Sequence, residues 1–182
     1  MSAPAAPEPA AIDRHLSAGA YAADRLAVAL KRIVALHAEV LADEDPEPLH
    51  QLRVTMRRLR TVLVQFERAL VLPEAVSEER IARVARRLGV ARDLDVLRDR
   101  LDHDLQPLLS APERERFKPI LKRLRRDRRL AFLDLEHQLK RGRYLAMLGA
   151  LQGWLRQPRF TPWGRSPPST GWGNGRRPAS AA

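Results

Sequence analysis

Apolar residues recur every three to four positions through most of the chain, which is the spacing of one face of an α-helix. Helix-forming residues dominate these stretches, and runs typical of β-strands are almost absent. The pattern predicts five helices, at residues 12–41, 46–70, 74–105, 111–139 and 144–156. Because short links join these long amphipathic helices, we expect an all-α fold, an antiparallel up-and-down helical bundle.

Capping and helix-breaking residues support several of these boundaries. Asp45 is expected to cap the second helix, with a proline at the first helical position, where a missing N–H costs nothing. Ser110 and Glu113 have the spacing of a capping box at the start of the fourth helix. Pro119 lies inside that helical pattern, so either the helix kinks there or it begins later. Gly142 marks the break before the last helix.

Both ends of the chain differ in composition from the helical part. Residues 1–11 are rich in Ala and Pro, and residues 158–182 hold much of the Gly and Pro of the chain. Such segments bury too little apolar surface to offset the entropy lost on ordering. We therefore expect a disordered N-terminus at 1–11, one helical domain at 12–157 and a disordered tail at 158–182.

The charge of the chain is large and unevenly distributed. The 182 residues include 33 Lys and Arg against 22 Asp and Glu, a formal net charge of +11. Acidic residues outnumber basic ones within 1–49, so the basic excess lies in the rest of the chain. A field of this kind attracts anions and speeds their capture, although it does not select among them.

Nothing in the sequence indicates export or insertion into a membrane. The chain has no cysteine, which excludes disulfides and thiolate metal sites. Its N-terminus lacks the charged start and apolar run of a secretory signal, and no apolar stretch approaches the roughly 18 residues that cross a bilayer. We therefore expect a soluble cytoplasmic protein without a membrane partner.

One face of the second helix carries a row of basic residues. The row consists of His50, Arg53, Arg57 and Arg60, with Arg58 at its flank. No acidic residue lies between Glu47 and Glu67, although like charges at this spacing repel one another. The row therefore favours a polyanionic partner over an ordinary solvated face, because the planar guanidinium donates paired hydrogen bonds to phosphate. His50 could add a donor when protonated, or simply cap or pack.

The fourth helix repeats this pattern on one stripe. The stripe consists of Lys118, Lys122, Arg125 and Arg129. We expect it to converge with the row of the second helix on a common strip where phosphoryl oxygens can dock. Arg128 falls within the apolar stripe instead, and a buried guanidinium needs a partner, so it either pairs with a core acid or faces a ligand cleft. In the third helix, Arg92 and Asp95 are i, i+3 neighbours, and the favoured interpretation is an internal ion pair that positions Arg92.

Two long stretches resemble the CHAD family, a helical domain named for its conserved histidines. The first is residues 45–60, with the pattern His50-x-x-Arg53, and the second is Leu88-Gly-Val-Ala-Arg-Asp-Leu-Asp-Val-Leu97. A weaker match follows at Arg128-Arg-Leu-Ala131, Arg143-Tyr144 and Trp154-Leu155, so the resemblance covers about residues 12–160. It implies half of a double bundle, because family members consist of two consecutive helical halves whose basic surfaces face a shared groove.

The resemblance also implies a ligand. Family members bind inorganic polyphosphate, often beside a triphosphate-processing CYTH domain, and Arg92 and Arg128 match family arginines. No second His-x-x-Arg helix follows residue 160 and no CYTH-like segment is present, so the domain is expected to be truncated after its first half, or altered by a change of reading frame. Such a half domain could present an open basic face, pair with a second copy as a homodimer that completes the groove, or be a remnant that no longer binds.

The leading hypothesis is non-catalytic binding of inorganic polyphosphate, without cofactor or metal, in the cytoplasm and in association with polyphosphate granules. The residues expected to bind are His50, Arg53, Arg57, Arg58, Arg60, Arg92, Lys118, Lys122, Arg125, Arg128 and Arg129. The alternative is a binder of nucleic-acid backbones or a helical protein-interaction module, although single-strand binders need exposed aromatic residues for stacking. An enzyme is the third and least favoured hypothesis. The five histidines lack the spacing of metal ligands, and no nucleophile or phosphate-loop motif occurs in the sequence. Asp102-His103-Asp104 could be a metal site, but a mixed-charge surface is commoner at a helix end.

Overall fold

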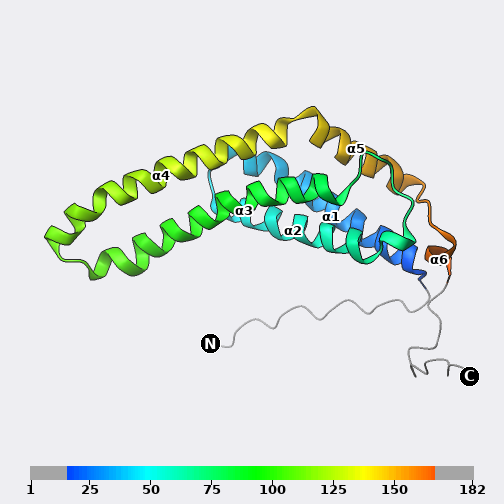
Figure 1. The fold of residues 1–182 in the computed structure, drawn as a ribbon, viewed down its shortest axis with the longest axis horizontal. Helices are drawn as coiled ribbons and strands as arrows, with labels where there is room; N and C mark the ends of the chain where they lie inside the picture. Colours follow the sequence, from blue (N-terminus) through cyan, green and yellow to red (C-terminus); the bar gives the residue numbers. More distant parts are fainter. Residues whose placement is uncertain (1–15, 167–182) are drawn as a thin grey trace, which may run out of the picture.

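The computed structural model describes residues 16–166, and in this range the fold is all-α, as predicted. Five helices of 15 to 30 residues carry it: α1 Ala18–Ala42, α2 Pro46–Gln65, α3 Glu78–Arg100, α4 Ala111–Lys140 and α5 Gly142–Arg156. α1 packs along α2, α3 lies between α2 and α4, and α5 returns to α1. Figure 1 shows the α1–α2 hairpin beside the longer α3–α4 hairpin.

Local hydrogen bonds explain where the helices begin. The carboxylate of Asp45 accepts from the backbone N–H of Glu47 at 2.8 Å, which confirms the predicted cap of α2. The N–H and hydroxyl of Ser110 both donate to the carboxylate of Glu113, at 2.8 and 2.6 Å, which confirms the capping box and lowers the pKa of Glu113. α4 begins at Ala111 and continues through Pro119, so the alternative of a later start is wrong.

Four helix boundaries differ from the prediction. The second helix ends at Gln65, and a 3₁₀ turn, Glu67–Ala69, follows it. The third helix begins at Glu78 because the side chain of Ser77 accepts from the N–H of Arg80, and its predicted last turn is a π-helical segment, Leu101–Leu105. The break before α5 falls at Arg141, where the backbone is extended, and Gly142 is already helical. Residues 12–15 lie outside the described residues.

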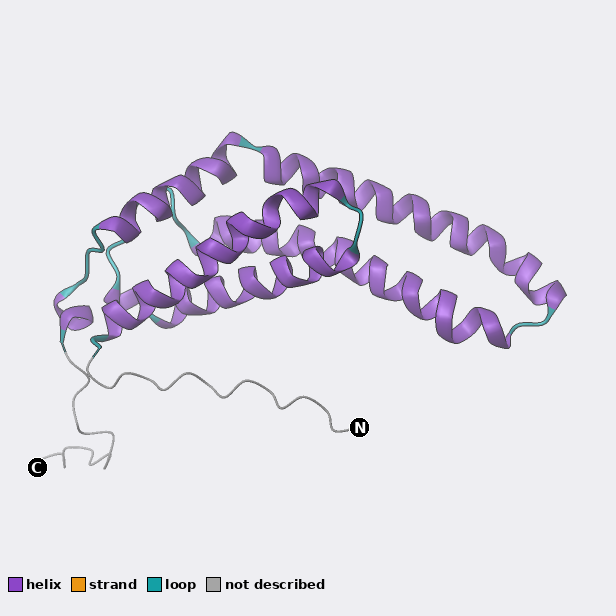
Figure 2. Ribbon diagram, turned by 180° about the vertical axis from the view of Figure 1, so that it is seen from behind, coloured by secondary structure: helices purple, strands orange, loops and turns teal. Residues whose placement is uncertain are grey.

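The apolar core is continuous through all five long helices but does not reach the end of the α3–α4 hairpin. It includes the fully buried side chains of Leu26, Ile33, Leu52, Leu59, Leu88, Leu135 and Leu151. On α3 the core ends at Ala91, and on α4 it resumes at Phe132. The hairpin end, residues 101–121, is called the arm here; it projects beyond the other helices (Figures 1 and 2). The arm therefore places a long charged stretch of α4 outside the main body.

The composition predicts that the helical domain ends at residue 157, but in the structure residues 158–166 also pack against it. The N–H of Val71 donates to the carbonyl of Arg159 at 2.9 Å, and the N–H of Thr161 donates to the carbonyl of Ala69 at 3.0 Å. The ring of Phe160 packs edge-on against Trp154, and a short helix, α6 Pro162–Arg165, contacts α1. Two aromatic rings and these backbone bonds compensate for the low apolar content of 158–166. The predicted disorder of 1–11 and of the rest of the tail, 167–182, lies outside the described residues.

Gly164 allows this segment to pack closely, and its replacement should be costly. A Cβ at Gly164 would overlap with the backbone carbonyl of Ala69, which cannot turn aside as a side chain can. We expect Gly164→Ala to lower the free energy of unfolding by about 1–3 kcal/mol, measured by urea denaturation. Gly153 in α5 is the matched control, because nothing lies within 4 Å of a Cβ there. Gly153→Ala should stabilise by roughly 0.5–1 kcal/mol, and equal effects at the two positions would contradict the close packing.

No helix in residues 16–166 combines the length and apolar character that a bilayer-spanning segment requires.

Candidate functional site

The basic row of α2 lies on the surface, next to α3. Arg53 and Arg60 are exposed, and each faces a carboxylate of α3: Asp93 lies 3.8 Å from Arg53, and Glu78 pairs with Arg60. Exposed pairs of this kind contribute roughly 0–1 kcal/mol because water screens them and both side chains must be held in place. The two arginines can therefore exchange these carboxylates for another anion at little cost.

The other basic residues of α2 have different surroundings. Arg57 and Arg58 are exposed and line an open groove between α1 and α2, of about 530 Å³, together with Arg25 and Arg32. His50 is half-buried in the second turn of α2. The row is thus divided between the α1 side and the α3 side of the helix.

The stripe on α4 is a basic surface with few acidic neighbours. The first 20 residues of α4, 111–130, contain nine basic and three acidic residues. Lys122, Arg125 and Arg129 are exposed, and no carboxylate of the described chain lies within 4 Å of their charged nitrogens. Lys118 pairs with Glu115 in the preceding turn. Three cations of the predicted stripe therefore face solvent without a neutralising partner.

Arg126 belongs to the same surface, although the sequence did not single it out. It is exposed between Arg125 and Arg129 and has no carboxylate within 4 Å in residues 16–166. At 100° per residue it falls beside the predicted stripe, and its run of basic neighbours is the signal that could have included it.

Arg128 is held by two carboxylates of its own chain. Its guanidinium donates to Asp95 at 2.9 Å and to Asp43 at 2.6 Å, and it lies 5.0 Å from the ring centre of Phe132. Desolvation lowers the pKa of Arg128, but the hydrogen bonds to Asp43 and Asp95 outweigh it, so the pKa is raised overall. Of the two predicted alternatives, pairing with a core acid is the one observed. Arg128 joins the end of α1 to α3 and α4, and a ligand would have to displace both acids to reach it.

The predicted ion pair between Arg92 and Asp95 does not form. Asp95 is only 2% exposed, and its carboxylate is taken by Arg128, with Arg98 at 3.9 Å. Arg92 instead lines a cleft of about 540 Å³ with Arg125, at the point where the start of α2 meets α3 and α4. The structure thus brings Arg92 and Arg125 together. The lining also includes the acidic side chains Asp45, Glu47, Asp95, Asp99 and Asp102, so the cleft has mixed charge.

The rows of α2 and α4 do not merge into one strip. α3 lies between the two helices, and its acids Glu78 and Asp93 face the α2 row. The two rows are therefore separate basic patches, whereas the sequence favoured a common one. Among the predicted binding residues of residues 16–166, Arg92 of α3 and Arg125 of α4 are the pair from different helices that line the same cleft.

The Asp102-His103-Asp104 segment lies in the π-helical turn at the base of the arm. Nδ1 of His103 lies 3.0 Å from the carboxylate of Asp99, one turn earlier. Within residues 16–166, no group of three or more His, Asp or Glu side chains is arranged to hold a metal ion.

Comparison with known proteins gives the family. A family model described as the CHAD domain matches residues 24–179. This chain belongs to the CHAD domain family. The crystal structure of the CHAD domain from the plant Ricinus communis is similar to this CHAD domain, with a TM-score of 0.65 and 26% sequence identity. The match covers 84% of this chain and 50% of the plant chain, so this chain spans about half the length of that CHAD domain. No curated protein sequence matched this chain.

The resemblance predicted from the sequence is thus confirmed, and the family model extends it to residue 179, through the predicted tail. The two long stretches that carried it, 45–60 and 88–97, lie on α2 and α3 of this CHAD domain. They pack against each other, because the side chain of Arg53 passes close to Gly89 and reaches Asp93. The family pattern therefore describes one contact between two helices.

Proposed function

We propose that this CHAD domain binds inorganic polyphosphate and does not catalyse its breakdown. The observation that carries the proposal is the α4 stripe, where Lys122, Arg125 and Arg129 are exposed without a carboxylate partner in a member of this family. With a rise of about 1.5 Å per residue, the stripe from 122 to 129 extends over about 10 Å. A linear chain of phosphates laid along the helix would place several negative charges beside it.

Separate patches suit a flexible polymer. A long phosphate chain can contact the α4 stripe and continue to Arg53 and Arg57 on α2 without a single closed groove. The weak exposed pairs of Arg53 and Arg60 offer little resistance, because phosphate oxygens replace the carboxylate oxygens that these arginines lose. We place Arg128 outside the binding surface, since its two carboxylates already satisfy it.

Titration with long-chain polyphosphate at rising salt tests this proposal. We expect tight binding at low salt that weakens steeply as salt rises, because polyanion binding releases counterions. A variant in which Arg53 and Arg57 are both changed to Ala should bind polyphosphate more weakly. Absence of binding at low salt, or indifference to both changes, would reject the proposal. Release of phosphate from polyphosphate by the pure protein would reject its non-catalytic part.

The alternative ligand is a nucleic-acid backbone. Stacking of bases needs exposed aromatic rings, but Phe132 is buried and Phe66 and Phe117 are partly buried. Trp163, 57% exposed in α6, is the one large aromatic side chain that is exposed in residues 16–166. Competition decides between the ligands: we expect DNA or RNA at equal phosphate concentration to leave bound polyphosphate in place, and its displacement would favour the alternative.

A further inference from the structure

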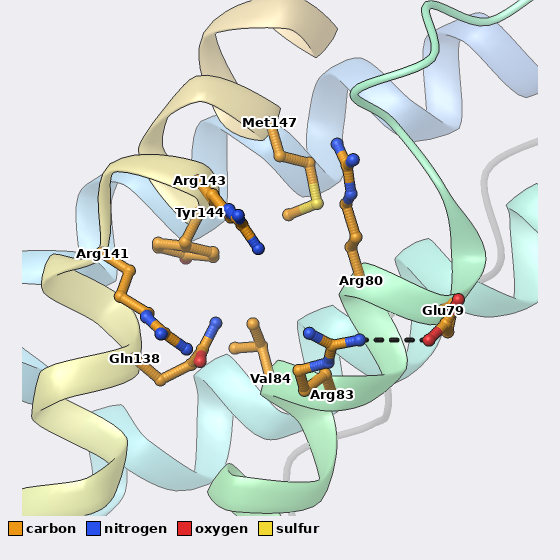
Figure 3. Close-up of a pocket in the computed structure, with 9 residues that line it drawn as sticks. All are labelled: Glu79, Arg80, Arg83, Val84, Gln138, Arg141, Arg143, Tyr144 and Met147. Atoms are coloured by element: carbon orange, nitrogen blue, oxygen red, sulfur yellow. Dashed lines mark hydrogen bonds and ion pairs between the residues drawn. The ribbon is translucent and has the colours of Figure 1, made fainter.

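A second group of arginines surrounds a pocket at the N-terminal end of α3, away from the cleft that Arg92 and Arg125 line. The pocket has a volume of about 260 Å³ and lies between the first turns of α3, the end of α4 and the start of α5. Arg80 and Arg83 come from α3, and Arg141 and Arg143 flank the junction of α4 and α5. Figure 3 shows these four side chains around one opening. None of them belongs to the basic rows of α2 and α4.

The charge of this pocket is almost uncompensated. Glu79 is its one acidic lining residue; it pairs with Arg83 at 3.1 Å, and its side chain is 77% exposed. Arg80, Arg141 and Arg143 have no carboxylate within 4 Å among residues 16–166. The guanidinium of Arg80 donates to the backbone carbonyl of Ala75 at 2.9 Å, which leaves its other N–H groups free to bind an anion.

Neutral polar groups complete the lining. The side-chain oxygen of Gln138 is buried without a hydrogen-bond partner, and so is the hydroxyl of Tyr144. Unsatisfied buried polar groups are rare in folded proteins. The Gln138 oxygen is an acceptor and calls for a donor such as water, so the group of Gln138 that can bind an anion is its amide N–H. In Figure 3 the amide nitrogen of Gln138 faces the opening. Burial raises the pKa of Tyr144, whose ring also stacks on His37 of α1.

Helix α5 adds to the positive potential. Arg141 and Arg143 stand at its N-cap and in its first turn, which has no acidic residue and no capping side chain. The free N–H groups of a first helical turn favour a negative charge nearby. The pocket thus combines guanidinium groups, amide and hydroxyl groups and a helix N-terminus.

We propose that this pocket binds a terminal phosphoryl group, the end of an inorganic pyrophosphate or of a polyphosphate chain. A terminal phosphoryl group carries up to about two negative charges near neutral pH, and three guanidinium groups without partners match it better than the single charge of an internal phosphate. The volume of about 260 Å³ suits a compact group, whereas the α4 stripe is open along its length. The inference goes beyond the proposed function and does not depend on it, because pyrophosphate alone can occupy the pocket.

Calorimetric titration of the full chain with inorganic pyrophosphate tests the inference. We expect one molecule to bind per chain, and Arg80→Gln with Arg143→Gln to weaken it about tenfold or more through loss of two charge-assisted contacts. Both side chains are exposed, so the fold should tolerate the changes. The matched control is Arg114→Gln with Arg116→Gln, which removes the same charge from the arm. No binding of pyrophosphate, or equal weakening by both pairs of changes, would overturn the inference.

Competition identifies the source of the phosphoryl group. Long-chain polyphosphate with free ends should displace pyrophosphate if the pocket takes chain ends, and polyphosphate whose ends are esterified should not. Failure of both to displace it would assign the pocket to free pyrophosphate. Equal displacement by both would overturn the inference, since the pocket would then not distinguish terminal from internal phosphates. If polyphosphate proves not to bind the α4 stripe, the expected binding of pyrophosphate in the pocket is unchanged, so the two proposals can fail separately.

Discussion

Replacement of Arg128 by Ala is expected to lower the free energy of unfolding by about 3 kcal/mol. The change removes the cation from the carboxylate of Asp95, which is 2% exposed and cannot turn to water. It also frees Asp43 at the end of α1, so the link between α1, α3 and α4 is lost. Arg98, at 3.9 Å from Asp95, compensates only in part. Urea denaturation monitored by circular dichroism measures the loss.

Two further variants show whether the buried charge causes this effect. Arg128→Met combined with Asp95→Leu removes both charges of the buried pair and should recover much of the stability, because apolar side chains often replace a buried ion pair without loss. The remaining acid, Asp43, is 28% exposed and can be solvated. Arg129→Ala is the matched control on the next, exposed position, and should change stability by less than about 0.5 kcal/mol. An Arg128→Ala protein as stable as the Arg129→Ala protein would contradict the structural role of Arg128.

Removal of the unpaired cations of α4 should weaken polyphosphate binding by about tenfold or more. The variant changes Lys122, Arg125 and Arg129 together to Gln, which removes three charges and keeps the helix, because Gln is a good helix former. All three side chains are exposed, so the fold should remain intact. Affinity is measured by titration with long-chain polyphosphate at one fixed salt concentration.

The matched control removes the same net charge elsewhere. Arg87, Arg123 and Lys140 each pair with a carboxylate, and changing all three to Gln leaves the α4 stripe unaltered. We expect this control to weaken binding much less than the α4 variant. Equal weakening would show that binding depends on total charge and not on the unpaired cations.

The parts of the fold that local sequence decides were predictable. The spacing of apolar residues located five helices, and the caps at Asp45 and Ser110 confirmed two of their starting points. A cap depends on residues within three positions of each other, so it can be read from the sequence. The same holds for exposure of the α4 stripe, since residues at i, i+3 and i+7 share a helix face.

Features that depend on distant residues were not predictable in the same way. The sequence placed Arg128 on the apolar stripe, but its partners lie 33 and 85 positions away. The packing of 158–166 depends on Trp154 and on the backbone of 69–71, so composition alone predicted disorder. The two pairs of pocket arginines are about 60 positions apart, and the packing of α3 against α4, which leads into α5, brings them together. The position of α3 between α2 and α4, which divides the basic rows, is likewise a tertiary feature.

The salt dependence of polyphosphate affinity is the most direct test of the central claim, that unpaired cations on α4 contact phosphates. For nucleic-acid backbones, each phosphate contact contributes about 0.7–0.9 to the slope of log affinity against log salt. The slope of the unchanged protein should therefore exceed that of the Lys122, Arg125 and Arg129 variant by about 2–3 in magnitude, for three lost contacts. Identical slopes for the two proteins would contradict the claim.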